Sequence, residues 1–209
     1  MTPLRVRILA YDGVEALDFA GPFEVFTTAA RVHQRLQPGT PAPFEVASVA
    51  HTRAGEPVQA RAGLRLLADH SLADAAATAD VLVVPGGVVD APMASPDTLR
   101  WIARCAASAQ LVASVCTGVF LLAQSGVVTR EAVTTHWEDL ADLRAQFPQL
   151  DVRDGVRWVD TGRIVSSAGI SAGIDMSLRL VERLAGRDLA ERTARQMDYR
   201  WTRNEPLSA

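Results

Sequence analysis

The strongest chemical signal in the chain is Cys116, in the segment Ser114-Val115-Cys116-Thr117-Gly118 that directly follows an apolar run. A nucleophile on a turn between a strand and a helix, with a glycine two positions later, is typical of a nucleophile elbow. Amides at the start of the following helix stabilise an anion, so we expect the pKa of the Cys116 thiol to fall. The alternative is a buried and inert cysteine, which is what we expect of Cys105 in the middle of a predicted helix.

A second candidate segment is Pro85-Gly86-Gly87, which follows another apolar run. Two glycines allow the backbone to approach a ligand closely, and we expect the amides of Gly86 and Gly87 to form an oxyanion hole with the amide of Thr117. The alternative is a plain tight turn. A phosphate-binding loop is not indicated, because the sequence contains neither GxGxxG nor GxxxxGK[ST].

Two further residues are candidates for moving protons. Asp18 precedes a predicted helix, where it is either an N-cap or a carboxyl beside the thiol, with a raised pKa if it is desolvated. His136 follows a predicted strand, where it either activates the thiol or caps a helix and packs on Trp137. The other histidines lack metal-ligand spacing, so we expect no metal site.

These segments need a scaffold that brings them together. The apolar runs 80–84 and 111–115 lack polar alternation, which is typical of strands buried on both faces of a mainly parallel sheet. In such sheets chemistry gathers at the carboxyl ends of the strands, where the segments of Asp18, Gly86 and Cys116 lie. Further strands are expected at 6–11, 44–50, 132–135 and within 156–166, a hairpin at 58–67, and helices at 22–31, 97–109, 118–125, 137–147, 171–184 and 188–201.

Length and composition restrict the class of protein. The 209 residues suit a single α/β domain spanning 1–209. The net charge of -3 gives no basic excess that would favour nucleic acid. We expect no signal peptide, no apolar run is long enough to span a bilayer, and two cysteines are too few for a disulfide framework. We therefore expect a cytoplasmic protein that binds neither nucleic acid nor a membrane.

Four motifs, taken in order, resemble the DJ-1/PfpI superfamily. The resemblance implies a flavodoxin-like three-layer sandwich with a mainly parallel central sheet. It also implies a homodimer, with the elbow cysteine beside an acidic residue from the first strand–helix loop. The motifs are Leu17-Asp18-x-x-Gly21-Pro22, Pro85-Gly86-Gly87, Ser114 to Gly118, and Thr134-Thr135-His136-Trp137 followed by Ala168 to Asp175.

Two branches of this superfamily look most similar. Isocyanide hydratase forms N-formamides without a cofactor, whereas the amidase-like domain of AraC-type regulators precedes a helix-turn-helix domain for which we expect no room in this chain. Thr117 follows the cysteine, where protease-like members have His, so peptidase activity is not expected. Cys116-Thr117 and Asp18 match the hydratase, and that match implies that Ile170 presents its backbone near the thiol.

The sequence therefore predicts a cofactor-free enzyme, a hydro-lyase that converts a small isocyanide through a thioimidate on Cys116. Asp18 would shuttle the protons and Thr117 would fix the pocket. One alternative is a redox or small-molecule sensor that uses Cys116 as an oxidisable thiol. Another is a glyoxalase- or deglycase-like activity, which the lack of a His next to the cysteine disfavours.

Overall fold

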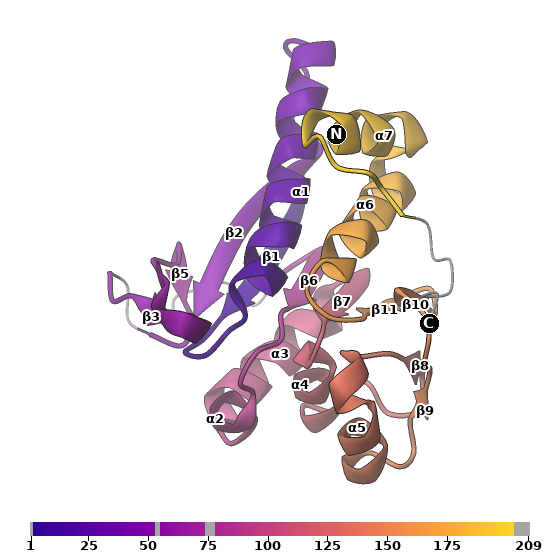
Figure 1. The fold of residues 1–209 in the computed structure, drawn as a ribbon. Coiled ribbons are helices and arrows are strands. Elements are labelled where there is room, and N and C mark those ends of the chain that lie inside the picture. The colour runs from indigo at the N-terminus through magenta and orange to yellow at the C-terminus, as the bar shows by residue number, and fades with distance from the viewer. Residues whose placement is uncertain (1, 53–54, 74–77, 203–209) are drawn as a thin grey trace.

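The computed structural model describes residues 2–52, 55–73 and 78–202, and its centre is a seven-stranded sheet (Figure 1). The strand order is β10-β11-β7-β6-β1-β2-β5, and every pair is parallel except β10 with β11. The predicted mainly parallel sheet is therefore confirmed. The strands are β1 (Leu4–Ala10), β2 (Phe44–Ala50), β5 (His70–Ser71), β6 (Val81–Val84), β7 (Leu111–Val115), β10 (Trp158–Asp160) and β11 (Ile164–Ser167).

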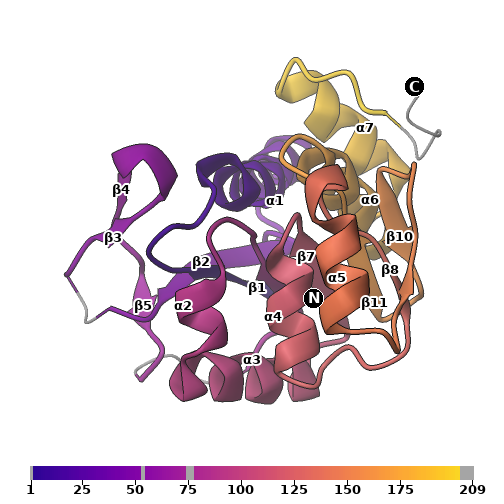
Figure 2. The same cartoon turned by 60° about the horizontal axis from the view of Figure 1, so that its bottom comes forward.

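Helices cover both faces of this sheet (Figure 2). On one face α1, α6 and α7 pack against one another, and α3 and α4 lie on the other face. The result is the expected three-layer α/β sandwich. The helices are α1 (Ala16–Leu36), α2 (Asp90–Met93), α3 (Pro96–Ser108), α4 (Gly118–Gln124), α5 (Leu140–Gln146), α6 (Ala172–Ala185) and α7 (Arg187–Gln196).

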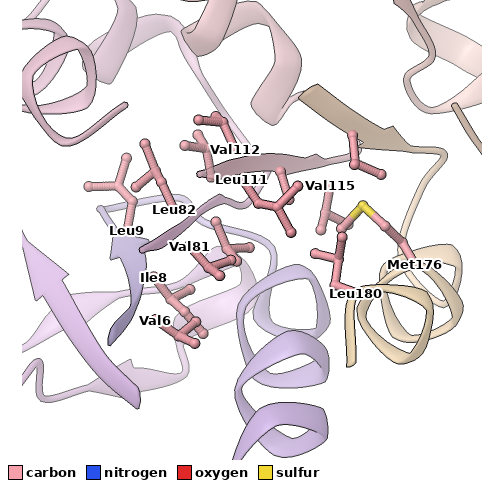
Figure 3. Packing of buried hydrophobic residues seen from close by; sticks show 14 of the residues in the cluster. Val6, Ile8, Leu9, Val81, Leu82, Leu111, Val112, Val115, Met176 and Leu180 are labelled. Atoms are coloured by element: carbon pink, nitrogen blue, oxygen red, sulfur yellow. The ribbon is translucent and has the colours of Figure 1, made fainter. Parts of the chain in front are cut away.

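The apolar runs explain why these strands lie in the middle of the sheet. Every residue of β6 and β7 is buried, because each strand has helices above and below it. Met176 and Leu180 of α6 point toward the strands from one side (Figure 3). Side chains of this kind contribute about 1.5–3 kcal/mol each when they are fully buried.

The order of the strands reverses at β1, which has β2 on one side and β6 on the other. This is the flavodoxin-like order, in which ligands bind outside the carboxyl ends of the strands beside the reversal. The register pairs Ile8 with Val83 and Val84 with Ser114, so β1, β6 and β7 end at one edge. The loops that carry Asp18, Gly86 and Cys116 all start from this edge.

The first helix differs from its prediction. α1 begins at Ala16 rather than at Pro22, and its N-cap residue is Glu15. Asp18 therefore lies within the first turn of the helix, and the N-cap interpretation of Asp18 is wrong. Pro22 has no N–H group, so it leaves the Asp18 carbonyl without its helical hydrogen bond.

Shorter elements depart from the prediction mainly in length. The hairpin is confirmed as β3 (Val58–Gln59) and β4 (Arg65–Leu66) around a 3-10 turn, η1 (Arg61–Gly63). The expected strand 132–135 is shorter, β8 (Ala132–Val133), and pairs with a strand that the sequence did not indicate, β9 (Asp151–Val152).

The predicted helices 137–147 and 188–201 are also modified. The first is divided into a 3-10 turn, η2 (Trp137–Asp139), and α5. The second ends at Gln196, and the chain then leaves the helical conformation before residues 199–202. Across the ranges that the structure describes, no helix combines the length and the apolar character required to cross a membrane.

Candidate active site

Cys116 lies on a strained turn between β7 and α4. Its φ of 55° falls in the left-handed region, which a residue with a side chain rarely adopts. Two hydrogen bonds hold the turn: the Cys116 amide donates to Ser167 O at 3.1 Å, and Thr135 Oγ1 donates to Cys116 O at 2.9 Å. The residue is only 8% exposed. The geometry is that of the predicted nucleophile elbow.

Gly118 allows the helix after the elbow to pack directly on the end of β6. A Cβ at this position would lie 2.0 Å from Val84 O and 2.9 Å from Pro85 O. No side chain fits into that space without moving the backbone. The glycine two residues after Cys116 is therefore required by the approach of α4 to β6.

Asp18 is fully buried and faces the thiol from α1. Its Oδ2 accepts a hydrogen bond from the Gly86 amide at 3.2 Å, whereas Oδ1 has no close hydrogen-bond partner among the described residues. Burial, reinforced by the charge of Glu15, raises the pKa of Asp18 to about 7, although the Gly86 amide, the Cys116 thiol and the Ile170 amide oppose this rise. A carboxyl with such a pKa can both donate and accept a proton near neutral pH.

The two glycines after β6 shape the site, but their amides are not available as an oxyanion hole. The Gly86 amide donates to Asp18, and the Gly87 amide donates to Thr117 Oγ1 at 2.8 Å. The Thr117 hydroxyl in turn donates to Gly87 O at 2.9 Å. Both amides therefore donate to protein acceptors in this structure, and neither is free for the predicted oxyanion hole. The Thr117 amide remains, and it acts on the sulfur by lowering the pKa of Cys116.

The pKa of the Cys116 thiol is raised to about 12, opposite to the expected fall. Burial is the largest cause, the negative charge of Asp18 is the second, and Asp139 adds to them. The amide at the start of the short helix α4 lowers the pKa but is outweighed. Since the Asp18 charge contributes to the rise, a proton on Asp18 favours the thiolate. Thiolate formation is therefore coupled to protonation of Asp18.

Ile170 lies on the loop between β11 and α6, in a left-handed conformation with φ of 52°. Its amide lowers the pKa of the Asp18 carboxyl. The structure thus brings the backbone of Ile170 to the acid that faces the thiol. The side chain points outward and is 41% exposed.

His136 has a structural position beside the site. It is the N-cap residue of η2, where Nδ1 accepts from the Glu138 amide at 3.4 Å, and its ring lies 5.5 Å from that of Trp137. Nδ1 also lies 3.6 Å from carboxylate oxygens of Glu138 and Asp139. A Cβ on Gly169 would lie 2.0 Å from the imidazole, so the ring fills the space above that glycine. The capping interpretation of His136 is confirmed, and no hydrogen bond joins it to Cys116 in the described part of the chain.

Two residues near Asp18 and Cys116 were missed by the sequence analysis. Tyr11 is buried at the end of β1, and its hydroxyl donates to Pro85 O at 2.9 Å. Burial and the charges of Asp18 and Cys116 raise the pKa of Tyr11 well above its usual value, so the phenol stays neutral. Its position at the carboxyl end of a central strand could have identified Tyr11 as a site residue from the sequence. Asp139 gave no signal of this kind, because it approaches Cys116 only through the fold.

A groove of about 470 Å³ opens beside Thr117. Both apolar side chains and carboxylates line it. The lining residues include Gly87, Val88, Met93 and Phe120, together with Asp90, Asp139 and Asp142. Among the described residues, no three His, Cys, Asp or Glu side chains come together as a metal site.

Comparison with known proteins gives a consistent family. The DJ-1/PfpI family profile matches residues 4–183. The chain is 32% identical over 197 residues to an isonitrile hydratase of Pseudomonas putida, which covers 94% of this chain and 78% of the hydratase. The fold superimposes on a ThiJ/PfpI family protein from Pseudomonas syringae with a TM-score of 0.81, at 26% identity, over 95% of this chain and 76% of that one.

Regulators are also similar to this chain. It is 30% identical over 151 residues to the HTH-type transcriptional regulator GbdR of Pseudomonas aeruginosa. The match covers 72% of this chain but only 41% of the regulator. Relatives with this fold therefore include both an enzyme and parts of transcription factors.

Proposed function

The chain belongs to the DJ-1/PfpI family, and from this premise we propose that it hydrates a small isocyanide to the N-formamide with Cys116 as nucleophile. The observation that carries the proposal is the buried Asp18, whose carboxyl has a pKa near 7 and faces the elbow thiol. Similarity to an isonitrile hydratase over most of both chains supports the substrate class.

The first half of the reaction forms a thioimidate. The Cys116 thiol passes its proton to the Asp18 carboxylate, and the sulfur attacks the terminal carbon of the isocyanide. Asp18 then returns the proton to that carbon, which gives R–N=CH–S–Cys116 and restores the carboxylate. Transfer within the pair avoids a thiolate beside a carboxylate in a buried site, which the raised pKa of Cys116 makes unfavourable.

The second half releases the product. The Asp18 carboxylate takes a proton from water as the oxygen adds to the thioimidate carbon, and that proton moves on to the nitrogen. The adduct is R–NH–CH(OH)–S–Cys116. Cleavage of the C–S bond, with the hydroxyl proton returned through Asp18 to the sulfur, gives R–NH–CHO and the thiol. One water is consumed, and both residues return to their starting states.

Thr117 has a positioning role in this proposal. Its amide acts on the sulfur, and its hydroxyl bonds both the amide and the carbonyl of Gly87. These contacts fix the wall of the groove through which a substrate would reach the elbow.

The test is formamide production from an aryl isocyanide by the purified protein. Cys116→Ala is expected to abolish turnover, and Cys105→Ala is the matched control. Cys105 is fully buried in α3, and burial raises its pKa to about 11, so its removal should leave the rate unchanged. Turnover that persists in Cys116→Ala would overturn the proposal.

A sensor is the second candidate, because the chain matches part of the regulator GbdR. Oxidation of a cysteine starts from the thiolate, and the raised pKa of Cys116 disfavours that form, so a small-molecule sensor is the stronger variant. Mass spectrometry after mild peroxide distinguishes the redox variant: oxygen addition at Cys116 supports it, and an unmodified Cys116 argues against it.

We also propose that residues 1–209 form one domain that assembles as a cytoplasmic homodimer. Family members are often homodimers. Leu17, Trp137 and Ile170 are large apolar side chains that are exposed beside the site residues, as expected for a contact surface. Light scattering of the full chain tests this: a monomeric mass would contradict it.

A further inference from the structure

Asp175 of α6 is a fully buried carboxylate that the proposed mechanism does not use. It accepts hydrogen bonds from Arg157 Nε at 2.7 Å, from the Tyr199 hydroxyl at 3.1 Å and from the Thr202 amide at 2.8 Å. Its own carbonyl accepts from Trp201 Nε1 at 3.1 Å. One side chain thus joins the start of α6 to the segment before β10 and to the chain after α7.

These partners lie at both ends of the loop formed by residues 168–171. The carbonyl of Arg157 accepts from the Ala168 amide at 2.8 Å, which fixes the first residue of the loop. The Tyr199 hydroxyl donates its single proton to Asp175 and lies 3.5 Å from Ser171 O, so it contacts the last residue of the loop. Between them lies Ile170, which has a left-handed backbone and whose amide lowers the pKa of Asp18.

The same helix also supports the element that carries Asp18. A Cβ on Gly21 of α1 would lie 3.0 Å from Ile174 Cγ1, so the second turn of α1 is in close contact with the first turn of α6. Both the amide directed at Asp18 and the helix that presents Asp18 therefore rest on the start of α6.

Stability alone does not account for this buried pair. An ion pair taken out of water loses about as much hydration as it gains in attraction, and well-packed apolar residues often replace it without loss. A planar guanidinium and a carboxylate, by contrast, fix direction as well as distance. This is the property that a loop in an unfavourable conformation requires.

We propose that Asp175, acting through Arg157 and Tyr199, is a positioning residue that keeps the Ile170 amide directed at Asp18. The inference rests on the proposed function only in taking Asp18 as the proton carrier. The quantity that it predicts is the pH at which Asp18 ionises, and this can be measured without substrate.

The test is an NMR titration of the Asp18 carboxyl carbon in the full chain labelled with 13C-aspartate, assigned with Asp18→Asn. In Asp175→Asn the Ile170 amide no longer stabilises the carboxylate, so the midpoint should rise by about one pH unit. Tyr199→Phe should move it in the same direction by less. Simple removal of a negative charge would instead lower the midpoint, so the sign separates positioning from electrostatics.

The other titratable groups that face Asp18 and Cys116 are unchanged in these variants. They are Glu15 before α1, Tyr11 at the end of β1 and Asp139 in η2. The matched control is Asp160→Asn on β10, which breaks ion pairs with Arg179 and Arg183 of the same helix α6. Its Asp18 midpoint should equal that of the wild type.

A midpoint that is unchanged or lowered in both Asp175→Asn and Tyr199→Phe overturns the inference. If Asp175→Asn does not fold, Tyr199→Phe decides alone, because it removes a single hydroxyl. A protein that fails to hydrate isocyanides but shows the upward shift would refute the proposed function and leave this inference standing.

Discussion

Gly86 and Asp18 are in direct contact: the Gly86 amide donates to Asp18 Oδ2 at 3.2 Å, and a Cβ on Gly86 would lie 2.9 Å from the same oxygen. That Cβ would also lie 2.6 Å from the amide nitrogen and the hydroxyl oxygen of Thr117. One glycine therefore allows the acid from α1 and the residue after the nucleophile to meet over the end of β6.

Gly86→Ala is expected to reduce isocyanide turnover by at least about 100-fold, because the methyl group must displace Asp18 or Thr117. Stability should fall by about 1–3 kcal/mol, as for other overpacked sites. Formamide production and urea unfolding measure the two effects.

The matched control is Gly39→Ala, in the loop after α1, where an added Cβ meets nothing within 4 Å. Its positive φ makes alanine unfavourable by about 1 kcal/mol, so stability should fall while turnover stays. Equal turnover in both variants would show that the space above Gly86 is unimportant.

Asp18→Asn should lower turnover by about 100-fold or more, because an amide cannot carry a proton from the sulfur to the isocyanide carbon. The fold should persist, since the amide keeps an oxygen to accept from Gly86. Steady-state kinetics should show the loss in kcat. Wild-type kcat in this variant would remove Asp18 from the mechanism.

The alkylation rate of Cys116 reports the raised pKa. With a pKa of about 12, the thiolate fraction should rise about tenfold for each pH unit from 7 to 9, and the rate of iodoacetamide modification should follow it. Peptide mapping should find the label on Cys116, because Cys105 is fully buried. A rate that is flat between pH 6 and 9 would instead indicate a thiolate stabilised by α4.

In Asp18→Asn the same alkylation should be faster than in the wild type above about pH 7, where Asp18 of the wild type is ionised. The carboxylate charge is the second cause of the raised pKa of Cys116, and the amide removes it. Alkylation and turnover should therefore change in opposite directions in one variant. Parallel loss of both would point to general damage to the site.

Much of the fold was predictable because the apolar runs have the pattern that is typical of strands in a mainly parallel sheet. The runs at Leu111–Val115 and Phe44–Ala50 are strands with the predicted bounds, and the turn after the first of them places Cys116. Their short length and the turn residues that bound them favour strands over buried helices. The sequence therefore sufficed for the central strands and for the elbow, whereas the two-residue edge strand β5 was not predicted.

The chemistry of the site was less predictable, because it depends on contacts between distant segments. The pKa of Cys116 is raised by burial and by Asp18, neither of which the local pattern of an elbow contains. The amides of Gly86 and Gly87 find their acceptors on α1 and at the elbow. The local sequence predicts where these backbone amides lie. Their hydrogen-bond acceptors come from distant segments, so they are known only from the fold.

The last prediction concerns stability and pH. The pKa of Asp18 is about 7 in the folded protein and near 3.8 in the unfolded chain, so the folded state binds the proton more tightly. Below about pH 4 the group is neutral in both states and has no effect. Stability is then lost as pH rises from about 4 to 7, by up to about 4 kcal/mol on the order-of-magnitude scale.

Asp18→Asn removes this loss, since the amide has no charge to bury. The free energy of unfolding of the variant, relative to wild type, should therefore increase from pH 4 to 7 and level off above pH 7. Urea unfolding at a series of pH values measures it. Asp160→Asn is the control for loss of a carboxylate in an ion pair, and it should show no such rise in this window. A constant difference between Asp18→Asn and wild type from pH 4 to 8 would mean that Asp18 ionises as freely in the folded protein as in the unfolded chain, and that a carboxylate with a normal pKa faces Cys116.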